Sequence, residues 1–131
     1  MSIRIDDLIG IPFVDKGRTI KGADCWGAVM IVYEAVKKKK LPDYGNSAFL
    51  SNLIADEIES QKISDHWLDI GEPEEGAIVL IQNHPIFVNH TGICLDKVRF
   101  AHCLNKRGFA IERLDHPLWK NRIRGFFRYV G

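Results

Sequence analysis

Residues 24–36 read DCWGAVMIVYEAV, and this stretch decides how the rest of the chain must fold. Asp24 is a good N-cap for a helix that begins at Cys25. Apolar residues then recur at spacings of three and four, as they do on one face of an α-helix. They are Ala28, Val29, Val32, Tyr33 and Val36. The pattern predicts a helix over residues 25–39 whose single apolar face needs a second layer to pack against.

The segments on either side of this helix differ from it in pattern. Residues 9–23 carry glycine and proline too densely for regular structure, so we predict a shaped loop there. Residues 41–45, LPDYG, break the helical pattern, and residues 47–61 resume it with apolar residues along one side. A second helix is therefore expected over residues 47–61.

Beyond Trp67 the apolar period changes from helical to alternating, which predicts strands. The candidate strands are residues 77–82, 86–95, 98–104, 109–114 and 123–130. The short turns between them imply antiparallel neighbours. Helices followed by a meander predict an α+β fold in which the N-terminal helices pack on an antiparallel sheet of about five strands.

Size and charge narrow the class of protein. A chain of 131 residues is expected to form a single domain over residues 1–131. With 18 basic and 17 acidic residues, it lacks the basic surplus of a nucleic-acid binder. No stretch approaches the roughly 18 uncharged residues of a membrane span. Residues 1–7 contain no apolar core of a signal peptide, so we expect synthesis in the cytoplasm without this export signal.

Three cysteines are present, at positions 25, 94 and 103. Their number is odd and their spacing is not that of a metal site, so we expect free thiols and neither a disulfide framework nor a zinc knuckle. Cys25 falls in the first turn of the predicted helix, where free backbone amides and the positive end of the helix dipole stabilise a thiolate. The same position is also ordinary for a small packed thiol. A nucleophilic cysteine needs a histidine base and a third group that orients this base.

Two histidines can supply these roles, because His90 and His102 both lie inside predicted strands joined by a short turn. If facing residue numbers sum to 194, His102 faces Gly92 and lies diagonal to His90, so that the two rings can touch. In the other register they point to opposite faces. A glycine at position 92 would make room for the His102 ring, although it can equally mark a bulge.

The resulting hypothesis has Cys25 attack a carbonyl, His90 move the proton and His102 orient His90. The backbone amide of Cys25 is the expected oxyanion donor. A zinc site built from the same three residues would lack a fourth ligand.

These motifs resemble the NlpC-type peptidoglycan peptidases. The resemblance lies in the segments GIPF (residues 10–13), GADCWG (22–27), HTGI (90–93) and FAH (100–102). The segments DCWG, LPDY (41–44) and RIRGFFR (122–128) resemble the phage tail-associated branch. The resemblance implies a papain-like α+β fold and hydrolysis, without metal or cofactor, of the bond between D-glutamate and a diamino acid in peptidoglycan stems. This chain has Phe13 where the family often has tyrosine, and Trp26 beside the nucleophile either lines the cleft or packs.

The resemblance thus implies a cell-wall cysteine peptidase of phage or prophage tail origin, with stem peptides as substrate and other tail proteins as partners. It would be made in the cytoplasm, travel in the virion tail and act at the bacterial cell wall. The alternative is a structural tail-tip assembly protein with a silent or weak catalytic site, which Phe13 favours. A third class, acyl or amide transfer on lipids, would be expected to expose an apolar groove or a membrane helix, and the sequence indicates neither.

Overall fold

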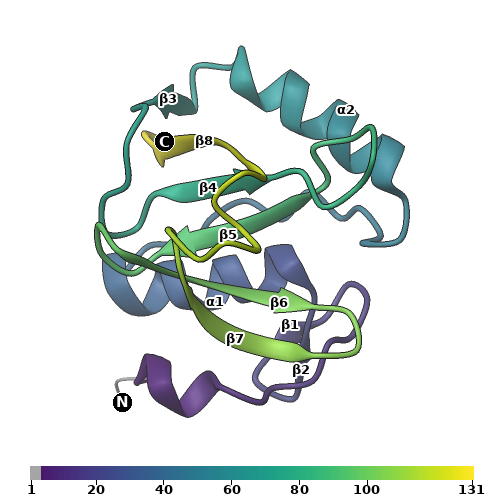
Figure 1. The fold of residues 1–131 in the computed structure, drawn as a ribbon, viewed down its shortest axis with the longest axis vertical. Helices are drawn as coiled ribbons and strands as arrows, with labels where there is room; N and C mark the ends of the chain where they lie inside the picture. Colours follow the sequence, from purple (N-terminus) through teal and green to yellow (C-terminus); the bar gives the residue numbers. More distant parts are fainter. Residues whose placement is uncertain (1–3) are drawn as a thin grey trace.

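A computed structural model describes residues 4–131 and places two helices against a six-stranded antiparallel sheet (Figure 1). Residues 1–3, the start of the segment discussed above for export, lie outside the described residues. The elements in chain order are the 3-10 helix η1 Ile5–Leu8, β1 Arg18–Thr19, β2 Gly22–Ala23, α1 Cys25–Lys37, α2 Ser51–Lys62, β3 Trp67–Asp69, β4 Ile78–Ile81, β5 His90–Cys94, β6 Arg99–Leu104, β7 Gly108–Arg113 and β8 Ile123–Tyr129. The α+β class is confirmed.

The strand order of the main sheet is β3-β8-β4-β5-β6-β7. Strands β4 to β7 form the predicted meander, but β8 returns across the sheet and pairs with β4 on one side and β3 on the other. The short strand β3, which was not predicted, raises the number of strands to six. The strands β1 and β2 form a small hairpin of their own within the segment predicted as loop.

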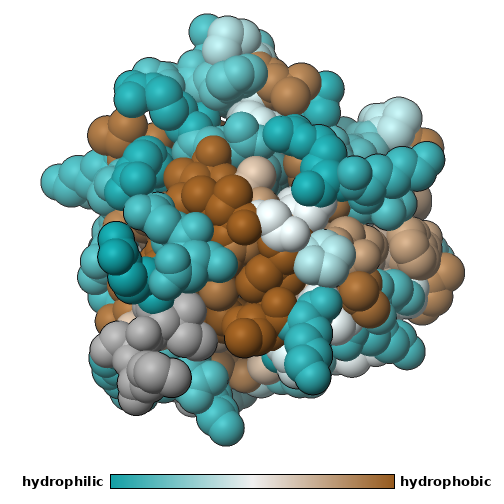
Figure 2. Space-filling view, turned by 90° about the horizontal axis from the view of Figure 1, so that it is seen from below, coloured by the Kyte–Doolittle hydropathy of each residue, from teal (hydrophilic) through white to brown (hydrophobic). Residues whose placement is uncertain are grey.

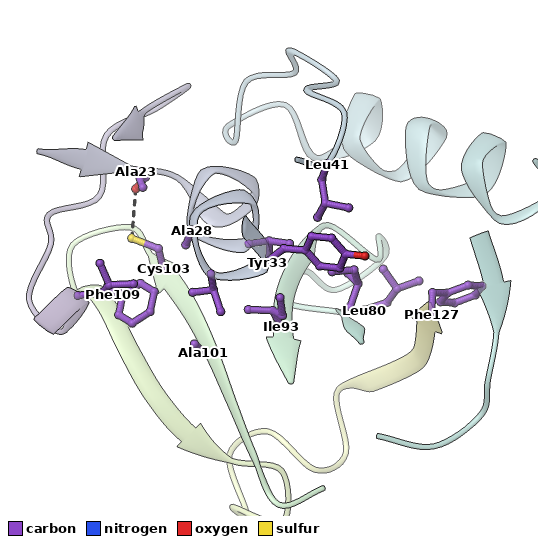
Figure 3. Packing of buried hydrophobic residues seen from close by; sticks show 14 residues of the cluster. Ala23, Ala28, Tyr33, Leu41, Leu80, Ile93, Ala101, Cys103, Phe109 and Phe127 are labelled. Atoms are coloured by element: carbon purple, nitrogen blue, oxygen red, sulfur yellow. Dashed lines mark hydrogen bonds between the residues drawn. The ribbon is translucent and has the colours of Figure 1, made fainter. Parts of the chain in front are cut away.

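Helix α1 forms for the reason that the sequence gives. The side chain of Asp24 accepts a hydrogen bond from the amide of Gly27 at 2.8 Å, and the helix ends at Lys38, whose φ of 58° is left-handed. Its apolar face packs on one face of the sheet, where Ala28 and Tyr33 lie beside Ile93 (Figure 3). Burying one valine or leucine side chain of this kind contributes about 1.5–3 kcal/mol, so this interface anchors the fold.

The opposite face of the sheet is buried as well. A second apolar cluster lies there, and the segment between β7 and β8 covers it with Trp119. The cluster consists of Ala77, Val79, Ile81, Cys94, Phe100, Leu104 and Trp119. Burial on both faces explains why β4, with the sequence IVLI, is a continuous apolar run rather than an alternating one.

Helix α2 begins at Ser51, four residues later than predicted. The cause is Asp15, whose carboxylate accepts hydrogen bonds from the hydroxyl of Ser47 at 2.7 Å and from the amide of Ala48 at 2.6 Å. This contact across 32 positions of sequence holds the segment before the helix in a turn. No residue of α2 is fully buried, so the helix lies loosely over the sheet.

Strand β5 begins at His90 rather than at residue 86. Residues 84–89 form a turn instead, in which the His84 ring accepts the amide of Ile86 at 3.0 Å and the Asn89 side chain accepts the amide of Asn83 at 2.9 Å. Side-chain acceptors therefore take the place of the strand-to-strand hydrogen bonds that the alternating pattern predicts for this segment. His90 consequently stands at the very start of its strand.

Figure 2 views the molecule from the side on which η1 and β7 lie in Figure 1 and shows apolar side chains gathered on this face. Elsewhere on the face hydrophilic side chains predominate. Exposed apolar residues of the N-terminal segment include Ile9, Val14 and Ile20. The fold therefore leaves apolar side chains of this segment in contact with solvent.

Substituting Gly27 in α1 tests the close contact between this helix and the loop before it. A Cβ atom at position 27 would overlap the carbonyl oxygen of Gly17. We expect Gly27→Ala to lower the free energy of unfolding by about 1–3 kcal/mol, although alanine favours a helix by about 1 kcal/mol over glycine. Urea unfolding measures the effect, and Glu34→Ala on the exposed side of α1 is the control. A Gly27→Ala protein as stable as the wild type would contradict this packing.

Candidate active site

Cys25 is the first residue of α1, and its side chain is almost fully buried. The cap bonds of Asp24 use the amides of Gly27 and Ala28. The amides of Cys25 and Trp26 precede these bonds and have no partner within the helix. The thiol therefore lies where free N–H groups and the positive helix end gather.

Asp24 does more than cap the helix. Its carboxylate also accepts the amide of Lys16 at 2.9 Å and the guanidinium of Arg18 at 2.7 Å. Arg18 in turn binds the carboxylate of Asp43 at 3.0 Å. All these contacts are structural, which confirms the interpretation of Asp24 as an N-cap and shows that it also ties the preceding hairpin to α1.

The start of α1 lies where strands β5 and β6 separate. Their ladder ends at the pair Ile93 and Ala101, whereas β6 stays paired with β7 as far as Leu104. Backbone groups of odd-numbered residues in β5 point toward β6, as the bond from Leu95 to Arg99 shows. The amide of Thr91 therefore points into the gap, where Cys25 lies.

The thiol of Cys25 is neutral at rest. Burial raises its pKa above the ordinary value, and the neighbouring carboxylate of Asp24 raises it further. The backbone amide and hydroxyl of Thr91 and the amide of Trp26 oppose this rise in pKa because they would bond to a thiolate. The predicted thiolate-stabilising groups are therefore present, but burial outweighs them.

The register predicted for the two histidine strands is confirmed. Ile93 pairs with Ala101 and Cys94 with Phe100, so facing residue numbers sum to 194. The rings touch as expected, with His90 Nε2 and His102 Nδ1 2.9 Å apart in the buried interior.

The closest neighbours of Gly92 are other groups than the one predicted. A Cβ atom there would meet the carbonyl oxygen of Ala101 and the ring of Phe100 at 2.9 Å, and Val79 at 3.1 Å. The missing side chain therefore makes room first for Phe100 and for the backbone of β6.

The histidine pair and the cysteine approach β5 from different sides. His90 and His102 share the sheet face of Phe100 and Trp119, whose rings contact the His102 ring at centroid distances of 4.9 and 4.8 Å. Cys25 reaches β5 from the α1 side at Thr91, the next residue after His90. Among residues 4–131, hydrogen bonds join the two histidines but do not join Cys25 to His90.

Sequence analysis missed Glu112, which extends the buried histidine pair. Its Oε2 atom lies 3.0 Å from His102 Nε2, and the guanidinium of Arg107 lies 3.7 Å from the same oxygen. The side chain is only 13% exposed. Strand alternation could have found it, because β6 and β7 form a hairpin in which Phe100 faces Glu112 and His102 faces Ala110.

The pKa shifts of the two histidines and Glu112 determine their charges at neutral pH. Burial, and secondarily His102, lowers the pKa of His90 well below its ordinary value. Burial also lowers the pKa of His102, although Glu112 opposes this. The hydrogen bond from His102 lowers the pKa of Glu112. Two neutral imidazoles and one carboxylate result.

A cavity of about 90 Å³ opens beside Cys25, between α2 and the sheet. Trp26 lines it and also packs on Tyr44 at a centroid distance of 5.4 Å, so the ring fills both roles considered for it. Its lining is largely apolar and includes Ile54, Ile58 and Trp67. An apolar groove was not expected from the sequence, and its presence corrects that expectation.

The other thiols lie away from this cavity. Cys94 and Cys103 are buried and free, and burial raises the pKa of each to about 12. Cys103 donates to the carbonyl of Ala23 at 3.1 Å (Figure 3), on the opposite sheet face from His102, as predicted. Residues 4–131 contain no group of three or more side chains arranged to hold a metal, and none of their helices is long and apolar enough to cross a membrane.

Comparison with known proteins identifies the family and the fold. The sequence model of the NlpC/P60 family matches residues 10–128. The fold is similar to that of a Staphylococcus aureus protein described as similar to lipoprotein, NLP/P60 family, with a TM-score of 0.64 and 20% identity over 100% of this chain and 44% of that one. It is also similar to the NlpC/p60 domain of peptidoglycan hydrolase SagA, with a TM-score of 0.61 and 16% identity over 95% and 92%.

These likenesses confirm the predicted NlpC-type fold. The chain spans less than half of the length of the Staphylococcus aureus protein. No curated protein sequence matches it significantly.

The raised pKa of Cys25 predicts how its alkylation depends on pH. We expect the rate of iodoacetamide labelling of Cys25 to rise with a midpoint above pH 9, because burial and Asp24 disfavour the thiolate. Peptide mass spectrometry separates Cys25 from the other two thiols. Asp24→Asn removes one cause and should lower the midpoint. A midpoint well below pH 9 in the wild type would show that the resting group is a thiolate.

The buried neutral histidines predict a loss of stability on mild acidification. Below about pH 6.5 the unfolded chain protonates these residues, whereas the folded chain keeps His90 and His102 neutral because their pKa values are lowered. The unfolded state then binds more protons, so the free energy of unfolding falls as pH drops from 7 to 5. Urea unfolding across this range should show a steeper fall in the wild type than in His90→Gln. Equal slopes would refute the burial of a neutral His90.

Proposed function

Because the chain belongs to the NlpC/P60 family, we propose that it is a cysteine peptidase that cleaves amide bonds in the stem peptides of peptidoglycan. The observation that carries the proposal is the placement of Cys25 at the start of α1, against the strand that begins with the hydrogen-bonded His90. In this proposal Cys25 is the nucleophile, His90 the base and His102 the group that orients the base.

In the proposed reaction, Cys25 Sγ attacks the carbonyl carbon of the scissile amide. Its proton passes to His90, which later donates it to the leaving amine, and water then hydrolyses the thioester. The free amides of Cys25 and Trp26 are placed to bond the oxyanion. The resting thiol is neutral, so proton transfer has to accompany the attack, with the bond from cysteine to histidine forming when substrate binds.

We further propose that the bond cut joins D-glutamate to a diamino acid, and that the protein acts from a phage or prophage tail at the cell wall, with other tail proteins as partners. The support is the sequence resemblance: the segments DCWG, LPDY and RIRGFFR resemble the tail-associated branch. The neighbour named a peptidoglycan hydrolase supports the general substrate class.

One observation favours a second candidate function. The largely apolar cavity beside Cys25 would suit the acyl chain of a lipid ester or amide, from which the thiol would form a thioester. A cavity of about 90 Å³ accommodates only a few methylene groups, which limits this candidate to the end of a chain or to a short one. Incubation with p-nitrophenyl octanoate and mass spectrometry of Cys25 would detect the acyl-enzyme that this function requires.

The peptidase proposal predicts which thiol is needed for cell-wall digestion. Wild type and Cys94→Ala should release stem-peptide fragments from purified peptidoglycan, whereas Cys25→Ala should release none above background, a loss of at least about 1000-fold. Cys94→Ala is the matched control because it removes a buried thiol from β5 itself. Mass spectrometry of the fragments identifies the bond. If folded wild-type protein releases nothing, the peptidase proposal fails and the assembly-protein alternative takes its place.

A further inference from the structure

We propose that Glu112 is a positioning residue of this site, which fixes the tautomers of His102 and His90 so that His90 Nδ1 is free to receive the proton of Cys25. The geometric basis is an unbroken chain of two contacts, 3.0 Å from Glu112 to His102 and 2.9 Å from His102 to His90. The arrangement of the protons follows from this chain alone. Only its use in catalysis rests on the proposed function.

The carboxylate of Glu112 determines which nitrogen of His102 carries the proton. An ionised carboxylate can only accept hydrogen bonds, and the pKa of Glu112 is lowered mainly by its bond with His102. His102 Nε2 must therefore carry the proton in the 3.0 Å contact. Because the neutral imidazole has one N–H, His102 Nδ1 is then an acceptor.

The contact between His102 and His90 then determines which nitrogen of His90 carries a proton. Since His102 Nδ1 accepts, His90 Nε2 must carry the proton of the 2.9 Å bond. The remaining nitrogen, His90 Nδ1, then holds a lone pair and no proton. That atom is the one available to a thiol, because Nε2 is occupied by His102.

Within the described part of the chain, the surroundings of His102 offer its Nε2–H group no acceptor other than Glu112. Its side chain is 0% exposed, and its ring contacts the rings of both Phe100 and Trp119. The second of these contacts is nearly perpendicular, at 86°. Neither aromatic ring edge offers an acceptor for an imidazole N–H, so Glu112 is the acceptor that meets Nε2. The carboxylate thus sets a proton position that packing alone would leave open.

The negative charge of Glu112 also stabilises the His90 cation that forms during the reaction. When His90 takes the thiol proton it becomes a cation in a buried site, which is costly without a nearby anion. Glu112 supplies that anion through His102, as a carboxylate does behind the histidine of a serine protease. The charged groups facing the relay are Glu112 and, at its rim, Arg107, whose cation lies 3.7 Å from the carboxylate; Asp24 lies on the Cys25 side.

The alternative is that Glu112 is a strand residue whose role is to pair with Arg107. That pair is weak, because its separation is 3.7 Å and the arginine is 54% exposed. The two interpretations differ in what they predict for the histidine rings. Only the relay links Glu112 to the protonation of His90.

The first test needs no substrate. We would measure the ring-nitrogen chemical shifts of 15N-histidine-labelled protein at pH 7 by NMR for the wild type, Glu112→Gln, Glu112→Ala and the surface control Glu59→Ala. The wild type should show both His102 and His90 protonated at Nε2. Glu112→Gln should keep these tautomers, since its amide oxygen still accepts, whereas Glu112→Ala should mix them. Protonation of His102 at Nδ1 in the wild type, or unchanged tautomers in Glu112→Ala, would overturn the proposal.

The second test measures the effect on catalysis. We expect kcat/KM for stem-peptide release to fall by about 10-fold in Glu112→Gln, which lacks the charge, and by about 100-fold in Glu112→Ala, which is the lower limit of what a general base supplies. In a His102→Leu background, Glu112→Ala should lower kcat/KM no further, because the hydrogen bonds that link Glu112 to His90 are already absent. Additive losses would mean that Glu112 acts structurally. If the wild type itself cleaves nothing, the proposed function fails, while the NMR result still decides the role of Glu112.

Discussion

The separation of β5 from β6 is the constraint on which the rest of the site depends. The two strands pair at Ile93 and Cys94, next to the bond from Leu95 to Arg99, and the start of α1 lies where they part beyond Ile93. A helix that packs on a continuous sheet would bury its first residue against side chains alone. Here Cys25 meets the backbone amide of Thr91, which no neighbouring strand uses. The nucleophile candidate and the strand that carries His90 are therefore brought together by the interruption of a ladder.

The burial of this site explains why its thiol and its two imidazoles are uncharged in the resting state. Because both faces of the sheet are covered, the thiol and the two imidazoles are almost fully buried, and burial is the largest cause of each pKa shift. Glu112 differs, because the hydrogen bond from His102, and to a smaller extent Arg107, lowers its pKa against the effect of burial. A thiolate and imidazolium pair would need both ions in the interior at once. The arrangement therefore favours moving the proton only when a substrate carbonyl is present to take up the charge.

Local chemistry explains what the sequence could predict. The Asp24 cap, the apolar face of α1 and the register of β5 with β6 depend on residues close together in the chain or on strict alternation, and all three are confirmed. The errors arise from distant contacts. Asp15 delays the start of α2, and β8 returns to pair with β4. Glu112 joins the site through a contact between strands, across the β6–β7 hairpin, and no motif next to Cys25 or His90 in the sequence indicates it.

The replacement of the usual family tyrosine by Phe13 bears on how the thiol is activated. The Phe13 ring packs on Phe49 at a centroid distance of 6.0 Å and offers no hydroxyl. A different hydroxyl, that of Thr91, lies beside Cys25, is buried, and has no hydrogen-bond partner among residues 4–131. An unpaired buried hydroxyl is destabilising by about 1–3 kcal/mol. A thiolate at Cys25 would accept its proton, which is why Thr91 lowers the pKa of the thiol. The resting state thus leaves unsatisfied a group that the reactive state satisfies, and this difference favours ionisation of Cys25 when substrate arrives.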